Sequence, residues 1–168
     1  METLLKILYL VVGVFLLLFL ESFFGSLMGF KIIFLLLLFT FKKIDWKQLF
    51  VLTLAISLVL DITTHYKMGT NLLLFTIPLG MFALFSLFSS VEDGVGSYVV
   101  RFFSIFLYYI LNLVLPELLI SGKFGYIDGR AILFSLIKAL LSILLMFSIN
   151  YVIGGVRKRG NASQIRLK

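Results

Sequence analysis

Long, almost unbroken runs of apolar residues are the feature that most constrains how this chain can fold. Six runs occupy residues 4–20, 32–41, 49–61, 72–88, 99–120 and 131–153. Hydrophobic residues make up 61% of the chain and charged residues 14%, more apolar surface than a soluble domain of 168 residues needs. The runs are continuous and not alternating, which favours helices over a β-barrel. The sequence therefore predicts an all-α, polytopic membrane helical bundle of six transmembrane helices.

The six runs differ in how clearly they predict a membrane span. The first ends in Glu21-Ser-Phe-Phe-Gly, which is unlike a signal-peptidase site, so we expect an uncleaved anchor. Gly25, Ser26 and Gly29 predict a turn after it. The second run, even extended back to Leu27, has about 15 residues, fewer than the roughly 20 of a straight span. It predicts either a thin span or a re-entrant helix.

Proline and glycine predict where the later helices bend or end. Pro78 lies inside the fourth run and is expected to kink that helix. Pro116 and Glu117 interrupt the fifth run near its end, and Gly154-Gly155 is expected to end the sixth. The predicted organisation is one transmembrane domain over residues 1–156, followed by a basic cytoplasmic tail over residues 157–168.

The distribution of Lys and Arg predicts the orientation in the membrane. With six spans and the N-terminus inside, ten of the 15 basic residues fall on the inner side and five on the outer side. The five outer residues are Lys31, Lys67, Lys123, Arg130 and Lys138. An excess of Lys and Arg marks the cytoplasmic side, so both termini are expected in the cytoplasm. A re-entrant second run would instead place the termini on opposite sides.

One polar stretch stands out from the apolar runs. Asp61 ends the third run, and His65-Tyr-Lys then forms a polar turn before Gly69 and Asn71 open the fourth. An acidic residue at the end of a membrane helix is costly unless it is solvated or paired, so it marks a candidate functional site. For Asp61 we favour a structural role that caps this turn over a catalytic one.

The predicted topology brings further ionisable residues to one depth. Glu21, Asp61, Glu117 and Lys138 would all lie near the outer surface, together with His65. They predict a polar cluster in which Asp61 or Glu117 pairs with Lys138. In the alternative, the acids lie in water at headgroup level and Lys138 extends its amine to the surface.

Composition also argues against several classes of function. The chain has no Cys and one His, which excludes a Cys-ligated metal and a zinc site built from His alone. It contains no phosphate-binding loop and no Gly-x-Ser-x-Gly motif. We therefore expect no cofactor, no metal, no nucleic-acid partner and no enzymatic activity. The tail residues Arg157, Lys158 and Arg159 predict contact with anionic membrane lipid, or else a docking site for a cytoplasmic partner.

The order of these pieces resembles the MreD family of bacterial rod-shape membrane proteins. Glu21-Ser-Phe is similar to the Gln/Glu-Ser turn after that family's first helix. Asp61, Gly69 and Asn71 fit its pattern of an apolar helix, an Asp, a few polar residues and a Leu-Gly pair. Here Met68 stands for the usual Leu, and bulky His65-Tyr-Lys replaces a Gly/Ser-type turn. The likeness covers most of the chain in architecture, and residues 61–71 as a motif.

The resemblance implies a non-enzymatic role in the bacterial cytoplasmic membrane. Such proteins are thought to bind MreC, a bitopic protein, and through it to link MreB with the wall-synthesis proteins RodA and its transpeptidase. The family's six-helix arrangement is similar to the S components of energy-coupling-factor vitamin transporters. The alternative hypothesis is therefore that the chain is the substrate-binding S component of such a transporter. The first run contains no Ala, whereas S components dock through an Ala-x-x-x-Ala-like pattern on helix 1.

Overall fold

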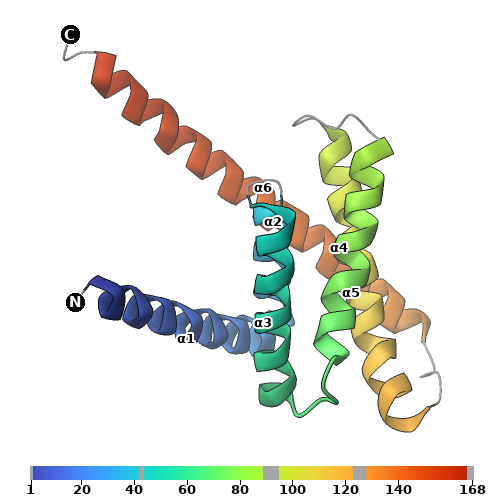
Figure 1. The fold of residues 1–168 in the computed structure, drawn as a ribbon. Helices are drawn as coiled ribbons and strands as arrows, with labels where there is room; N and C mark the ends of the chain where they lie inside the picture. The colour runs from blue at the N-terminus through green and yellow to red at the C-terminus, as the bar shows by residue number, and fades with distance from the viewer. Residues whose placement is uncertain (1, 42–43, 89–94, 123–127, 166–168) are drawn as a thin grey trace. The chain divides into compact units, whose positions relative to one another are not determined.

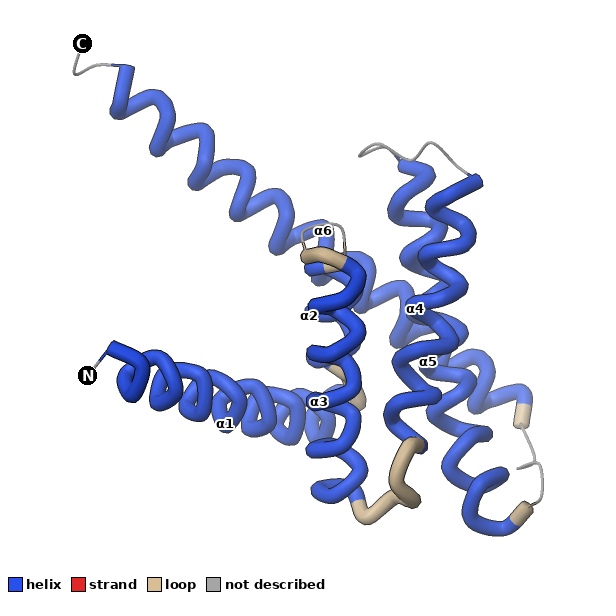
Figure 2. The backbone as a smooth tube through the Cα atoms, in the orientation of Figure 1, coloured by secondary structure: helices blue, strands red, loops and turns tan. Residues whose placement is uncertain are grey.

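The computed structural model describes residues 2–41, 44–88, 95–122 and 128–165, in which short turns connect α-helices and the described residues contain no strand (Figures 1 and 2). For residues 2–11, 14, 27–28, 88, 95 and 152–165 only the backbone is described. The helices are α1 (Glu2–Met28), α2 (Ile32–Thr40), α3 (Trp46–Thr64), α4 (Thr70–Phe88), α5 (Val95–Ser121) and α6 (Gly129–Ile165).

The chain divides into two compact units with their boundary inside α4. Unit 1 covers residues 1–79 and contains α1, α2, α3 and the first half of α4. Unit 2 covers residues 80–168 and contains the rest of α4 with α5 and α6. The single domain predicted over residues 1–156 stays a prediction.

Four helices among the described residues are long and apolar enough to cross a membrane. They comprise α3, α4 to Leu87, α5 from Gly96, and α6 to Tyr151. In α1, the side chains are described over a shorter stretch, and residues 15–26 of it are apolar enough to count as a short apolar helix. The length and composition of these helices indicate a membrane protein. The prediction of an all-α membrane protein is therefore confirmed, whereas the prediction of six transmembrane helices stays a prediction.

The second run forms a shorter helix than a membrane span requires. The nine residues of α2 measure about 14 Å, against a hydrocarbon core of about 30 Å. Its extension back to Leu27 was wrong, because α1 continues through Gly25 and Ser26 to Met28. Gly29 then adopts a left-handed φ of 66° and donates its N–H to the Gly25 carbonyl, a common end for a helix.

Two further breaks predicted from glycine and proline do not occur. Helix α5 continues through Pro116 to Ser121. Helix α6 continues through Gly154-Gly155 and ends at Ile165, so the prediction that this pair ends the helix was wrong. A helical glycine costs only about 1 kcal/mol relative to alanine, and a proline removes one backbone hydrogen bond, so neither has to end a helix.

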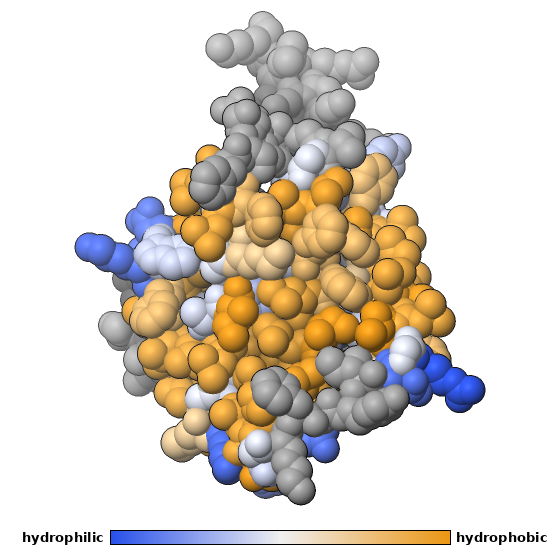
Figure 3. All heavy atoms as spheres, turned by 90° about the vertical axis from the view of Figure 1, so that its right-hand side faces the viewer, coloured by the Kyte–Doolittle hydropathy of each residue, from blue (hydrophilic) through white to orange (hydrophobic). Residues whose placement is uncertain are grey.

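Helix α3 buries polar side chains and exposes apolar ones, the reverse of a helix in a soluble protein. Its buried stripe runs through Leu49, Thr53, Ser57, Leu60 and Asp61, so three of the five buried side chains are polar. Apolar side chains occupy its exposed faces, among them Val51, which is 65% exposed, and Ile62, which is 62% exposed. Figure 3 shows the same character on one face of the molecule, where hydrophobic residues dominate. Apolar side chains outside and small polar ones inside are what a hydrocarbon environment favours.

Helix α2 is buried in unit 1. Ile33, Phe34, Leu35, Leu37 and Leu38 are all buried. The Phe34 ring stacks on the Phe75 ring of α4 at 6.1 Å between centroids. A short helix that is apolar on every side is stable only when its surroundings are apolar too. This helix thus supplies the apolar packing that positions the end of α1 and the start of α4.

Small residues dominate where α6 packs on α5 in unit 2. Ser135, Ala139, Ser142 and Met146 form the buried stripe of α6. The Tyr109 and Ser142 hydroxyl oxygens lie 3.2 Å apart and share a hydrogen bond between the helices. Small side chains let membrane helices approach closely, and hydroxyl groups then bond across the interface.

Candidate functional site

The turn between α3 and α4 is organised by the buried carboxylate of Asp61, which is only 1% exposed. Oδ2 accepts the backbone N–H of Gly69 at 2.6 Å. Oδ1 accepts both the backbone N–H of Asn71, at 2.9 Å, and its side-chain amide, also at 2.9 Å. Three donors therefore compensate a carboxylate that would otherwise be costly to bury.

The same residue closes both helices. The first backbone N–H groups of α4 have no partner within their own helix, and Asp61 accepts one of them from Asn71. A carboxylate is also favoured there by the helix dipole. At the other end, the Asp61 backbone carbonyl accepts the N–H of His65 and, at 3.1 Å, that of Tyr66. Asp61 thus ends α3 with its backbone and caps α4 with its side chain.

Two residues of the turn have left-handed backbone conformations. His65 has a φ of 55° and Gly69 a φ of 93°. Glycine adopts such a conformation without the steric cost that a Cβ brings, which explains Gly69. His is one of the few other residues enriched in this conformation. The sequence predicted a polar turn here but not the left-handed conformation of His65.

The residues between the two caps face outward. His65 and Lys67 are exposed, and the Met68 side chain is 75% exposed. They project from a turn whose backbone is fixed at both ends by one buried carboxylate. The predicted turn residues Asp61, Gly69 and Asn71 are therefore brought together, with His65 at the surface beside them.

A second buried carboxylate joins α1 to α2 in the same way. Glu21 is 7% exposed and accepts the backbone N–H of Ile33, in the first turn of α2, at 2.9 Å. The Lys31 amine lies 3.8 Å from its other oxygen. Both hairpins of unit 1 therefore use an acid from the first helix to cap the second.

The remaining members of the predicted polar cluster lie in unit 2. Glu117 is exposed, and no ion pair joins it to Lys138 among the described residues. The Lys138 amine instead lies 6.0 Å from the centre of the Tyr109 ring. Asp61 belongs to the other unit, so its pairing with Lys138 stays a prediction.

Sequence reasoning missed several buried polar residues. Arg101 is only 9% exposed, and its guanidinium lies 5.6 Å from the centre of the Tyr98 ring. Its Nε has no hydrogen-bond partner among the residues that the structure describes. We had counted Arg101 only as one of the ten basic residues on the inner side. The four-residue spacing of Thr53, Ser57 and Asp61 could have revealed the buried stripe of α3.

The Asp61 carboxylate is fully engaged within the turn. Both carboxylate oxygens of Asp61 already accept hydrogen bonds, and general acid–base work requires a carboxyl group within reach of a substrate. In the part of the chain that the structure describes, no three His, Asp or Glu side chains lie close enough together to hold a metal ion. The side chains of Arg157, Lys158 and Arg159 lie outside the described residues.

Comparison with models of protein families, with curated proteins and with solved structures found no match to this chain.

Removing the Asp61 charge should destabilise unit 1. In Asp61→Asn an amide –NH₂ replaces one acceptor oxygen, so a buried backbone N–H loses its partner. We expect a loss of about 3 kcal/mol in the free energy of unfolding, measured by denaturant titration in detergent micelles. Asp45→Asn is the matched control, because Asp45 is exposed and makes no side-chain capping bond. Equal losses in the two variants would contradict the capping role.

Proposed function

We propose that this chain is a non-enzymatic membrane scaffold that holds a bitopic partner through the α3–α4 turn. The observation that carries the proposal is the triple hydrogen bonding of the buried Asp61 carboxylate by Gly69 and Asn71. These hydrogen bonds give the Asp61 carboxylate a structural role, and they fix the backbone from which the His65 and Met68 side chains project. A rigid, partly apolar surface of this kind lowers the entropy lost when a partner binds.

The partner that we propose is an MreC-like bitopic protein of the bacterial cytoplasmic membrane. Asp61, Gly69 and Asn71 carry the resemblance to the MreD family, and the same three residues are joined by hydrogen bonds in the turn. Contacts with MreB, RodA and its transpeptidase would follow indirectly, through that partner. This assigns the chain to the cell-shape and peptidoglycan-synthesis machinery.

We further propose a topology of six crossings with both termini in the cytoplasm. It requires α2 to be a thin crossing, and it places the basic residues 42–47 on the inner side, as the Lys and Arg distribution favours. The α3–α4 turn then lies on the outer side, where a partner's extracytoplasmic domain can reach it.

Cysteine labelling in intact cells tests this topology, since the chain has no native Cys. We expect His65→Cys to react with a membrane-impermeant maleimide added outside, because the His65 side chain is exposed in the turn. Lys158→Cys should react only after the cells are opened. If α2 returns to the side from which it enters, His65→Cys will be protected, and the six-crossing topology fails.

Crosslinking in native membranes, followed by purification of the tagged chain, tests the scaffold. We expect recovery of a single-span protein with an outer coiled coil, reduced at least fivefold by His65→Ala combined with Met68→Ala at equal expression. Leu87→Ala is the control, because Leu87 is 80% exposed at the opposite end of α4.

Two results would contradict the scaffold. The first is equal recovery with the turn variant and the control. The second is recovery of ATP-hydrolysing subunits, which would favour the hypothesis that the chain is a transporter S component.

A further inference from the structure

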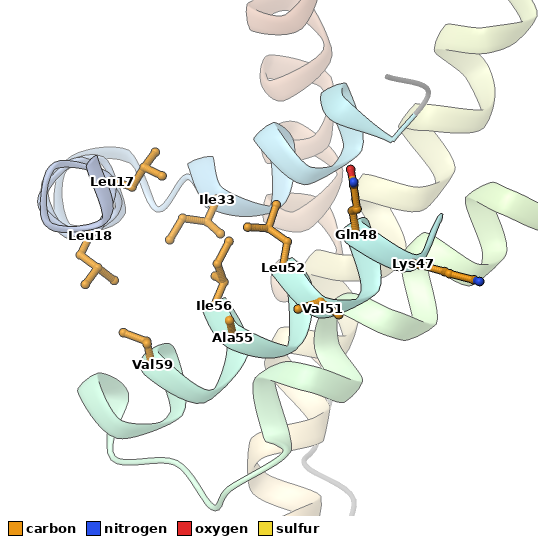
Figure 4. A pocket seen from close by; sticks show the side chains of 10 residues that line it. All are labelled: Leu17, Leu18, Ile33, Lys47, Gln48, Val51, Leu52, Ala55, Ile56 and Val59. Atoms are coloured by element: carbon orange, nitrogen blue, oxygen red, sulfur yellow. The ribbon is translucent and has the colours of Figure 1, made fainter. Parts of the chain in front are cut away.

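An apolar groove lies between α1, α2 and α3 in unit 1, with a volume of about 600 Å³ (Figure 4). Its floor is a row on α3, formed by Val51, Ala55 and Val59 at the four-residue spacing that aligns side chains on one helix face. Ile33 of α2 flanks this row. The groove faces away from the buried stripe of α3, so it opens to the surroundings of unit 1.

The two ends of the groove differ in chemistry. Leu17 and Leu18 of α1 lie at the end near Val59, where α1 crosses the other helices steeply (Figure 4). Lys47 and Gln48 lie at the other end, in the first turn of α3. Trp46 precedes them and is 58% exposed, as expected for a Trp at a membrane–water interface. The groove is thus lined by apolar side chains at one end and has a cationic side chain at the other.

The dimensions match one lipid chain in one leaflet. Lys47 and Val59 are twelve residues apart on α3, which corresponds to about 18 Å along the helix. Half of a hydrocarbon core is about 15 Å. A helix that spans the membrane is about 30 Å long and 10 Å wide, so its volume of roughly 2,400 Å³ exceeds the groove several-fold.

We propose that the groove binds one acyl chain of an anionic phospholipid, with the lipid phosphate beside Lys47. The chain runs along Val51, Ala55 and Val59 toward Leu17 and Leu18. The small side chain of Ala55 leaves room at the middle of the floor.

Quenching of tryptophan fluorescence by brominated phospholipids tests this site. Trp46 is the only Trp in the chain and is adjacent to Lys47, so its emission reports on the headgroup end. The full-length protein is reconstituted in bilayers that contain brominated phosphatidylglycerol or brominated phosphatidylcholine. We expect the wild-type protein to bind the anionic lipid about two- to fivefold more tightly.

Three substitutions, with a fourth in reserve, make the test specific. Lys47→Gln should lower the preference for the anionic lipid, and Ala55→Phe should weaken quenching by both lipids because its ring occupies the floor. Leu58→Phe is the control, because Leu58 is on α3 and 38% exposed but does not line the groove. Val51→Phe replaces Ala55→Phe if the latter fails to fold, since Val51 is 65% exposed.

Three results would overturn the proposal. These are an unchanged lipid preference in Lys47→Gln, equal effects of the groove variant and Leu58→Phe, and a photo-crosslinker at Val51 that captures protein and no lipid in native membranes. The quenching readout needs no partner protein. The lipid-binding proposal can therefore be tested independently of the proposed scaffold function.

Discussion

The carboxylate of Asp61 is the interaction on which the arrangement of α3 and α4 depends. A helix that starts within or near hydrocarbon carries N–H groups that water does not satisfy, and each one left unpaired is costly. Asp61 accepts two such groups around the start of α4 while its backbone carbonyl accepts the N–H groups that end α3. One residue thereby fixes the angle and register between two helices.

The α1–α2 hairpin repeats this solution with different residues. Glu21 accepts the Ile33 N–H, and Gly29 provides the left-handed turn that Gly69 provides in the second hairpin. Both acids are buried, and both lie toward the end of the first helix of their hairpin. Unit 1 is therefore held by two acid-capped helix starts, with the apolar α2 packed between its neighbours. Exposed side chains on α3 of this unit, among them Val51 and Ile62, are apolar.

The sequence predicted those features that depend on neighbouring residues and failed where packing decides. Asp61, Gly69 and Asn71 could be recognised as one turn because they lie within eleven residues and combine an acid, a glycine and a helix start. The role of Glu21 could not be recognised, because its partner Ile33 is twelve residues away and the end of α1 was placed too early. Glycine propensity also misled the prediction at Gly154-Gly155, where the helix continues. Arg101 was counted only as a basic residue of the inner side, because nothing in the neighbouring sequence shows that its side chain is buried in α5.

Amide hydrogen exchange at the α3–α4 turn tests the central claim most directly. The account predicts that the N–H groups of Gly69 and Asn71 exchange as slowly as those inside α4, because the Asp61 carboxylate holds both. In Asp61→Asn, where one acceptor oxygen remains, at least one of the two should exchange at least tenfold faster, and this increase should exceed the increase at amides in the middle of α4. Fast exchange at Gly69 and Asn71 in the wild-type protein would contradict the account, because the carboxylate would then not hold the turn.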